Sequence, residues 1–310
     1  MNSRVINAYN FKDVDISDYK IEFKYDEAKI ERELARLANH NAIWTTGKPV
    51  AKGDVVVCSM SSEIPKFERD KISFTVGTKL FDKDVENAII NKNIGDIFSV
   101  DKNGQEIKVE LLEVRNKEIK LVNDEMVCSL GIENVKSVEE YKVYLKEQQF
   151  NEFFKDKIYE PLNYIVETVL KNSDILLKQE DWQKYVDYRL AHLNGLAGFE
   201  GLELKTMTEQ DFQGRIPVKS YDGFLAMLQK DAWKTCYVSL LGRALAEENG
   251  YVITDNQYNN FLEEVSSDWK RDVEEYKSFY SFEYYQVNSY GRYYWQQVEK
   301  WLRENLISCK

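Results

Sequence analysis

The chain has 310 residues, of which 43% are hydrophobic and 31% are charged, a balance typical of a folded protein with room for two domains. Its net charge of −11 argues against a surface devoted to binding nucleic acid. Most of this charge falls in residues 118–310, which carry a net −10. We therefore expect no nucleic-acid partner.

The cysteines lie far apart and form no CxxC pair, so the sequence predicts no zinc site and no thioredoxin-like motif: Cys58, Cys128, Cys236 and Cys309. Scattered cysteines are typical of a reducing compartment. No apolar run approaches the roughly 20 residues of a membrane span. Residues 1–20 lack the apolar core of a signal peptide. We therefore expect a cytoplasmic protein, the alternative being an extracytoplasmic one whose export signal is not part of this sequence.

The N-terminal third divides into an arm, a helix and a small β module. Residues 1–22 are polar with sparse aromatics and predict an extended arm. A helix over residues 26–39 follows, with Ile30, Leu34 and Leu37 on its apolar face. A β-branched run then predicts a strand at residues 55–57, and period-two alternation predicts strands near residues 72–76, 95–100 and 107–114, with a short helix over 82–91. Asn103-Gly104 is a strong signal for a hairpin turn.

The rest of the chain has the pattern of long amphipathic helices. Ser137 and Glu140 form a capping box, and Pro161 predicts a kink in the helix that follows. A second helix contains Tyr185, and a third ends at Asn249-Gly250. Thr254 or Asp255 caps a fourth helix, and the last helix surrounds residues 290–302. Between the second and third helices we expect a loop over residues 194–217, because it contains Gly195, Gly198, Gly201 and Gly214.

Motifs of common enzyme sites are absent from the sequence. It contains no HExxH, GxSxG, GxGxxG or P-loop pattern, and no metal or organic cofactor is predicted. His40 falls near the end of a helix and His192 lies within one, with Asp187 but no cysteine nearby. For both histidines we favour an exposed or capping role over a catalytic one.

The order of these parts resembles the trigger factor family, in which an FKBP-type isomerase domain interrupts a helical chaperone body. Residues 53–57 (GDVVV) resemble the opening strand of FKBP-type domains, and residues 109–118 resemble their closing strand. Residues 74–77 with 84–96 resemble the central passage between them, and residues 207–212 (MTEQDF) resemble a short helix of the family's helical body. The resemblance covers roughly residues 20–305.

This resemblance implies an α+β fold, with a small FKBP-like antiparallel β domain inserted in a mainly helical body. The expected domains are an N-terminal arm and helix over 1–42 that pack with the body, a reduced isomerase-like domain over 43–117 and a helical chaperone domain over 118–310. The family's N-terminal ribosome-binding domain, with its Gly-Phe-Arg-x-Gly-x-x-Pro loop, has no counterpart in residues 1–42. Ribosome binding is therefore not implied.

The isomerase-like segment departs from the FKBP pattern at its pocket. The flap loop is replaced by the short interval Asp101 to Gln105, and the "GFE" passage reads Lys83-Asp84-Val85 without its glycine. Its aromatics are candidates for a vestigial isomerase pocket and fit equally well as core of a small sheet: Phe67, Phe74, Phe81 and Phe98. Whether the protein is a peptidyl-prolyl isomerase is therefore left open, and no catalytic residue is assigned.

Ten of the twenty residues from Tyr276 to Trp295 are aromatic, more than one buried helix stripe requires. Helical spacing predicts a buried stripe that contains Tyr290, Tyr294, Val298 and Trp301. Residues off that stripe are candidates for contact with a client protein or a second copy of the chain: Tyr280, Tyr284, Tyr285 and Tyr293. Tyrosine is enriched where proteins bind other proteins.

The function that fits these observations is an ATP-independent chaperone of the trigger factor type that holds unfolded or nascent polypeptides and assists folding. The first alternative is an active FKBP-type prolyl isomerase. The second is a non-catalytic module that assembles with one fixed protein partner. A homodimer is compatible with all three, and none requires a membrane or a nucleic acid.

Overall fold

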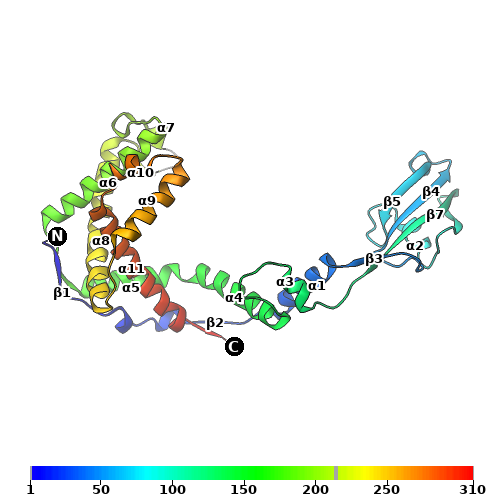
Figure 1. The fold of residues 1–310 in the computed structure, drawn as a ribbon, viewed down its shortest axis with the longest axis horizontal. Helices are drawn as coiled ribbons and strands as arrows, with labels where there is room; N and C mark the ends of the chain where they lie inside the picture. Colours follow the sequence, from blue (N-terminus) through cyan, green and yellow to red (C-terminus); the bar gives the residue numbers. More distant parts are fainter. Residues whose placement is uncertain (1, 213–215, 310) are drawn as a thin grey trace. The chain divides into compact units, whose positions relative to one another are not determined.

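The computed structural model describes residues 2–212 and 216–309, which separate into two compact units (Figure 1). The helical unit comprises residues 1–24 and 150–310, and the β-containing unit comprises residues 25–149. The fold class is α+β, as the sequence predicted. The domain boundaries at 42 and 117 stay a prediction, because the compact units divide the chain elsewhere.

An antiparallel sheet dominates the β-containing unit. Its strands are β3 (Ile43–Thr45), β4 (Val55–Ser62), β5 (Arg69–Thr75), β6 (Ile97–Lys102) and β7 (Gln105–Glu118). The order is β3-β7-β4-β5, and β6 also pairs with β7. Alternation along β7 buries Ile107, Val109 and Leu111 and exposes the charged residues between them. The short helix α2 (Lys83–Ala88) adds Val85 to the same core.

The strands β6 and β7 are joined by the predicted hairpin turn. Asn103 has φ 57° and Gly104 has φ 82°, the left-handed pair that a two-residue type I′ turn requires. The connection is therefore too short to contain a flap loop at this place.

The remaining part of this unit is a small helical cluster. The helix α1 (Glu27–His40) packs against α3 (Asp124–Cys128) and the start of α4 (Val138–Lys157). The contact buries Ile30 and Leu34 against Val127 and Tyr141. The capping box at the start of α4 is confirmed, because Glu140 accepts the N–H of Ser137 while the Ser137 hydroxyl accepts the N–H of Glu140.

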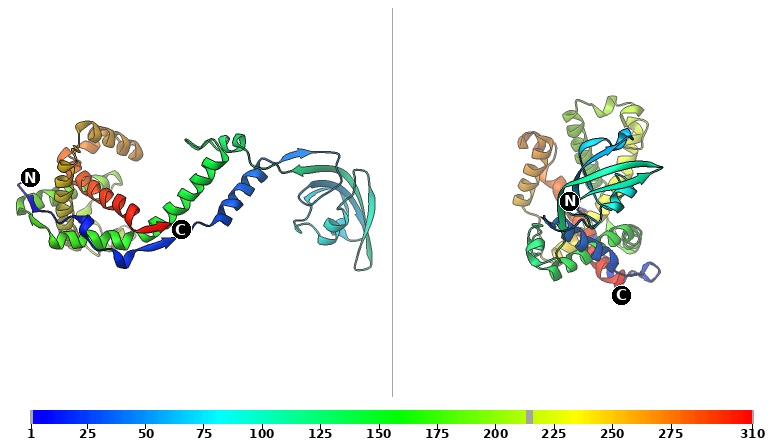
Figure 2. Two further views of the ribbon diagram at one scale, coloured as in Figure 1. Left: turned by 90° about the horizontal axis from the view of Figure 1, so that it is seen from below. Right: turned by 90° about the vertical axis from the view of Figure 1, so that its right-hand side faces the viewer.

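The helical unit begins with the N-terminal arm, which is tied down at both ends. Its strand β1 (Arg4–Asn7) pairs antiparallel with β8 (Asp174–Leu176), and β2 (Ile21–Phe23) pairs parallel with β9 (Ile307–Cys309). Between them lie short 3₁₀ turns at Phe11–Asp13 and Ser17–Tyr19. The arm runs beside α5 (Tyr159–Asn172) in Figures 1 and 2, and Phe11, Val14 and Ile16 join its core.

The other helices of this unit are α6 (Gln179–Phe199), α7 (Glu209–Phe212), α8 (Tyr221–Glu248), α9 (Asp255–Trp269), α10 (Val273–Lys277) and α11 (Phe282–Asn305). The predicted kink is confirmed as a break between α4 and α5 at Ile158, since Pro161 has no N–H to donate to the carbonyl of Lys157. The predicted capping of α9 by Thr254 is confirmed, with Gln257 as its partner. None of these helices, as far as they are described, has the length and apolarity needed to cross a bilayer.

The loop predicted over residues 194–217 is wrong in its first part. Helix α6 continues to Phe199, through Gly195 and Gly198. A Cβ at Gly195 would lie 2.4 Å from the ring of Phe279, so this glycine makes room for an aromatic neighbour rather than ending the helix. Gly214 lies outside the described residues. The short helix expected near residues 207–212 is present as α7.

Candidate functional site

An apolar groove opens where α6 ends. It has a volume of about 230 Å³, and its lining comes from α6, the segment that connects α6 to α7, α7 itself, and the ends of α8 and α9. Its lining residues are Leu193, Leu196, Ala197, Glu200, Leu202, Leu204, Met207, Phe212, Ile216, Phe224 and Trp269. Glu200 is the only titratable side chain in this set. The groove can therefore accept apolar side chains and has little to offer a charged ligand.

The chain turns at Gly201 to build one wall of this groove. Gly201 has φ 73°, and the N–H of Leu202 donates to the carbonyl of Ala197 at 2.9 Å while the N–H of Gly201 donates to Gly198. These bonds form a Schellman motif, which needs a left-handed residue and favours glycine there. The turn brings Leu202 back beside Leu196 and Ala197. Sequence analysis missed this groove, because it interpreted the segment as a loop.

Of the aromatic residues expected at the surface, Tyr280 and Tyr284 are instead in the core. They are 6% and 4% exposed, so the prediction of exposure is wrong for both. The physical reason is a change of direction: α10 ends at Lys277 and Ser281 caps a new helix, so residues 276–305 do not share one stripe. Helix α11 also packs against several helices and needs a wider apolar face than one stripe supplies.

The two other candidates, Tyr285 and Tyr293, are half-buried and already have partners. The Tyr285 hydroxyl donates to the carbonyl of Gln257 at 3.2 Å. The ring of Tyr293 stacks on Tyr251 at 4.5 Å, and its hydroxyl accepts a bond from Asn249. Their role in client contact stays a prediction. Of the predicted buried stripe, Tyr294 and Val298 are buried, whereas Tyr290 and Trp301 are half-buried.

His192 lies among the buried tyrosines rather than at the surface, which corrects the expected exposed or capping role. Its Nε2 is 2.9 Å from the hydroxyl of Tyr276, and its ring lies edge-on to Tyr280 at 4.7 Å. Burial, with a smaller effect of Arg189, lowers the pKa of His192 to about 4. The imidazole is therefore neutral at pH 7 and serves as a hydrogen-bonding member of the aromatic core. His40 is exposed at the end of α1.

In the β-containing unit, three of the four candidate pocket aromatics come together. Phe74 stacks on Phe81 at 4.6 Å, and Phe67 meets Phe81 edge-on at 6.0 Å. Phe67 is only 2% exposed and belongs to the core of the sheet. Phe98 packs against the same core but has its ring beside Lys92.

Two lysines approach these aromatic rings. The Nζ of Lys66 is 5.0 Å from the centre of the Phe67 ring, and that of Lys102 is 5.9 Å from the same ring. Lys102 also forms ion pairs with Asp82 and Asp84. Burial alone would raise the pKa of Asp82, but the hydrogen bonds from Lys102 and from backbone N–H groups outweigh it and lower the pKa. Charged groups thus lie directly beside the rings of the candidate pocket.

A buried carboxylate that sequence analysis did not single out organises the loop beside these rings. Glu86 is 2% exposed, and its carboxylate accepts the backbone N–H groups of Gly77, Lys79 and Phe81 at 2.8–3.1 Å. Its role is structural, since three backbone donors satisfy it. Among the described residues, no three His, Cys, Asp or Glu side chains come together to hold a metal ion.

Comparisons with known proteins point to one family. The family profile described as "Bacterial trigger factor protein (TF) C-terminus" matches residues 137–288. The trigger factor of Aquifex aeolicus is 29% identical over 222 residues, which cover 62% of this chain and 44% of that protein. The trigger factor of Thermoanaerobacter sp. is 22% identical over 299 residues, 90% of this chain and 66% of that protein.

A solved trigger factor chaperone structure, described as concerning promiscuous substrate recognition in folding and assembly activities, is 17% identical and has a TM-score of 0.36. It covers 99% of this chain and 79% of the other. The chain spans from under half to about two thirds of the length of the curated relatives above. The order of motifs, the matched C-terminal profile and the named relatives together show that this chain belongs to the trigger factor family.

Proposed function

We propose that this protein is an ATP-independent chaperone that holds unfolded or nascent polypeptides. The observation that carries the proposal is the apolar groove at the end of α6, together with membership of the trigger factor family. Apolar side chains are buried in native proteins and exposed in unfolded ones, so a groove of this chemistry selects for the unfolded state. The net charge of −10 over residues 118–310 favours solubility of this part of the chain.

The size of the groove favours weak and reversible binding. Burying one Leu or Phe side chain contributes about 1.5–3 kcal/mol. Two such side chains give at most about 6 kcal/mol before the cost of ordering the peptide is subtracted, whereas a micromolar complex needs about 8 kcal/mol. Binding at this groove alone would therefore be weaker than micromolar. That suits a protein that must release its clients so that they can fold.

We also propose that the isomerase-like domain is degenerate and does not catalyse prolyl isomerisation. The two-residue turn at Asn103-Gly104 and the ammonium groups beside Phe67 support this reading. Desolvation of the imide is the main means by which a prolyl isomerase works, and it needs an apolar, covered pocket. We expect the full chain to leave the isomerisation rate of a Xaa-Pro test peptide near its uncatalysed value. A rate comparable to that of an intact FKBP-type enzyme would favour the isomerase alternative.

The groove is tested by substituting Leu196, which is half-buried in its wall, with glutamate. We expect Leu196→Glu to weaken binding of a chemically unfolded client by about tenfold, which corresponds to about 1.4 kcal/mol. Val252→Glu is the matched control, because Val252 is an apolar residue of the same unit that is 67% exposed and outside the groove lining. Suppression of client aggregation is the readout, with melting curves to check that both variants fold.

If Leu196→Glu suppresses aggregation as well as the wild type does, the groove is not the client site. Binding of one partner and no suppression for a set of unrelated clients would favour the assembly module instead. A cytoplasmic location is part of the proposal and is supported by the wide spacing of the four cysteines along the sequence, which is typical of a reducing compartment.

A further inference from the structure

Three Asn-Gly pairs occur in the chain, at residues 103–104, 194–195 and 249–250. In this dipeptide the side-chain amide is lost most readily, because the glycine has no Cβ to hinder its nitrogen from attacking the asparagine side chain. The reaction also depends on local structure, since that nitrogen must reach Cγ of the asparagine and give up its hydrogen. The same dipeptide in three environments therefore separates the effect of the fold from that of the sequence.

The first pair forms the turn between β6 and β7. Asn103 and Gly104 are both exposed, and Gly104 belongs to neither strand. Among the residues that the structure describes, none forms a hydrogen bond with the side-chain amide of Asn103. The N–H of Gly104 donates to the exposed carboxylate of Asp101 at 3.2 Å. Neither reacting group is therefore held by the main-chain ladder of the sheet.

The end of this hairpin can open without exposing the core of the sheet. The two residue pairs next to the turn, formed by residues 101–102 and 105–106, have exposed or half-buried side chains. The first buried pair is Val100 with Ile107. Exposed chain ends and loop tips open at a low free energy, whereas core elements open only at a high one. The geometry needed for attack is therefore reached by fraying of the hairpin tip.

The second pair lies inside a helix. Asn194 and Gly195 belong to α6, where each N–H donates to the carbonyl four residues earlier. Gly195 also lies against the ring of Phe279, which leaves no room even for a Cβ. Attack by the Gly195 nitrogen would break a helix hydrogen bond and move the main chain beside that ring. The fold therefore protects Asn194, although its side chain is exposed.

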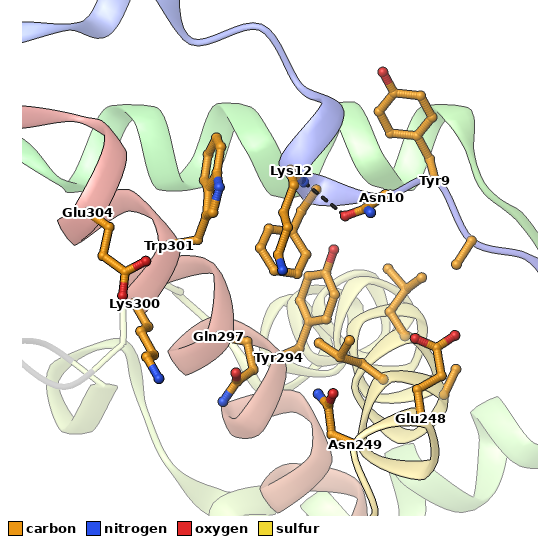
Figure 3. A pocket seen from close by; sticks show the side chains of 15 residues that line it. Tyr9, Asn10, Lys12, Glu248, Asn249, Tyr294, Gln297, Lys300, Trp301 and Glu304 are labelled. Atoms are coloured by element: carbon orange, nitrogen blue, oxygen red, sulfur yellow. Dashed lines mark hydrogen bonds between the residues drawn. The ribbon is translucent and has the colours of Figure 1, made fainter.

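The third pair follows the end of α8, and both of its reacting groups are held. Figure 3 shows Asn249 and Glu248 at this end of the helix, in the lining of the cavity drawn there. The side-chain amide of Asn249 donates to the hydroxyl of Tyr293 at 3.0 Å. The N–H of Gly250 donates to the carbonyl of Glu247 at 3.3 Å. Both bonds must break before the reaction, so this pair is protected more than the hairpin turn.

We propose that Asn103 is a modification site, which deamidates spontaneously and in preference to the two other asparagines of this type. The nitrogen of Gly104 attacks Cγ of Asn103, and its hydrogen passes to the side-chain amide, which leaves as ammonia. The five-membered imide that results takes up one water molecule, which cleaves one of its two C–N bonds. Cleavage at the side-chain carbonyl gives aspartate. Cleavage at the main-chain carbonyl gives isoaspartate, in which the chain continues through the former side chain.

Both products change the turn, and isoaspartate changes it more. Each product adds one negative charge at position 103. Isoaspartate also lengthens the main chain by one methylene group, which a two-residue type I′ turn cannot accommodate. We expect the tip of the hairpin to loosen, while the buried pair of Val100 and Ile107 keeps the register of β6 and β7.

The test follows the three asparagines in the full-length protein. The protein is incubated at mildly alkaline pH and digested, and mass spectrometry of the peptides measures the conversion of each amide to an acid. We expect Asn103 to react at least about tenfold faster than Asn194, where α6 must open at a cost of at least about 1.4 kcal/mol. Asn249 should also react more slowly than Asn103. In denaturant the three rates should become similar. The inference is overturned if Asn103 reacts no faster than Asn194 in the folded protein, or if the same ratio persists in denaturant.

Two variants at position 103 test the site and its consequence. Asn103→Gly keeps a dipeptide that suits the type I′ turn but has no amide to lose. It should lose most of the isoaspartate signal that an isoaspartate methyltransferase with labelled S-adenosylmethionine detects in the aged wild type. An unchanged signal would place the modification elsewhere and overturn the inference. Freshly prepared Asn103→Asp adds the charge without lengthening the chain. Amide hydrogen exchange over residues 100–107 should therefore be faster in the aged wild type than in this variant, and equal exchange would contradict the loosening of the turn.

Discussion

Gly242 decides how closely α8 and α11 approach each other. A Cβ added at this position would lie 1.9 Å from the carbonyl oxygen of Tyr290 and 2.7 Å from its carbonyl carbon. Both are backbone atoms of α11, so no side-chain rotation can relieve the clash. At a helix position with free space around it, replacing glycine with alanine stabilises the folded protein by about 0.5–1 kcal/mol. Here overpacking costs about 1–3 kcal/mol or more, because a helix must shift.

Because the clash is with backbone atoms, we expect the upper end of this cost, so Gly242→Ala should lower the free energy of unfolding by about 2 kcal/mol after the gain in helix propensity is subtracted. Chemical denaturation followed by circular dichroism measures this change. The control is Gly291→Ala on the partner helix, where nothing lies within 4 Å of the added Cβ. That variant should gain about 0.5–1 kcal/mol. If Gly242→Ala is as stable as the wild type, the close packing of α8 on α11 is not as described.

Three further predictions concern the buried carboxylate of Glu86, the half-buried His192 and the domain order. Glu86→Ala should lower the free energy of unfolding by about 3 kcal/mol, because three backbone N–H groups lose their acceptor. The control Glu106→Ala, at an exposed position, should change it by less than about 0.5 kcal/mol. Equal effects of the two variants in thermal unfolding would contradict this prediction. The pKa of His192 is about 4 in the folded protein and 6.5 for an ordinary histidine. As the pH falls, this imidazole is therefore protonated in the unfolded chain before it is protonated in the folded one. Stability contributed by the neutral imidazole is thus complete above about pH 6.5 and is lost as the pH falls toward 4, by up to about 3 kcal/mol. Denaturation at several pH values should show this slope in the wild type but not in His192→Phe. Deleting residues 53–114 should leave a helical circular dichroism spectrum if the β module is an insertion, and a spectrum of an unfolded chain would refute that order.

Features that depend on adjacent residues could be predicted from the sequence. The turn at Asn103-Gly104, the caps at Ser137 and Thr254 and the break before Pro161 are set by local backbone chemistry. Each of these residues favours one conformation whatever its surroundings. The family resemblance was readable for a similar reason, since it rests on the order of short motifs along the chain.

Features that depend on distant contacts could not be predicted. Gly195 has the composition signal of a loop, yet it lies inside α6 because Phe279, 84 positions later, fills the space beside it. Glu86 is a charged residue on a short helix, and only the folded loop of residues 77–81 supplies the donors that bury it. Periodicity within one segment contains no information about such partners.

The aromatic segment from Tyr276 to Trp295 shows why the client site proposed from the structure differs from the one predicted from the sequence. This segment contains more aromatic residues than one buried helix stripe requires, and the extra residues suggested a binding surface. That count assumed a single neighbour for the last helix, whereas α11 contributes to two hydrophobic cores and its preceding turn contributes Tyr276 and Tyr280 to one of them. The additional aromatic side chains are buried in these internal contacts. Unfilled apolar surface lies instead beyond the end of α6 at Phe199, next to the turn at Gly201, among the side chains of Leu193, Leu196 and Met207. The surface that we propose for client binding thus lies where a helix ends and its apolar face is no longer covered by another element.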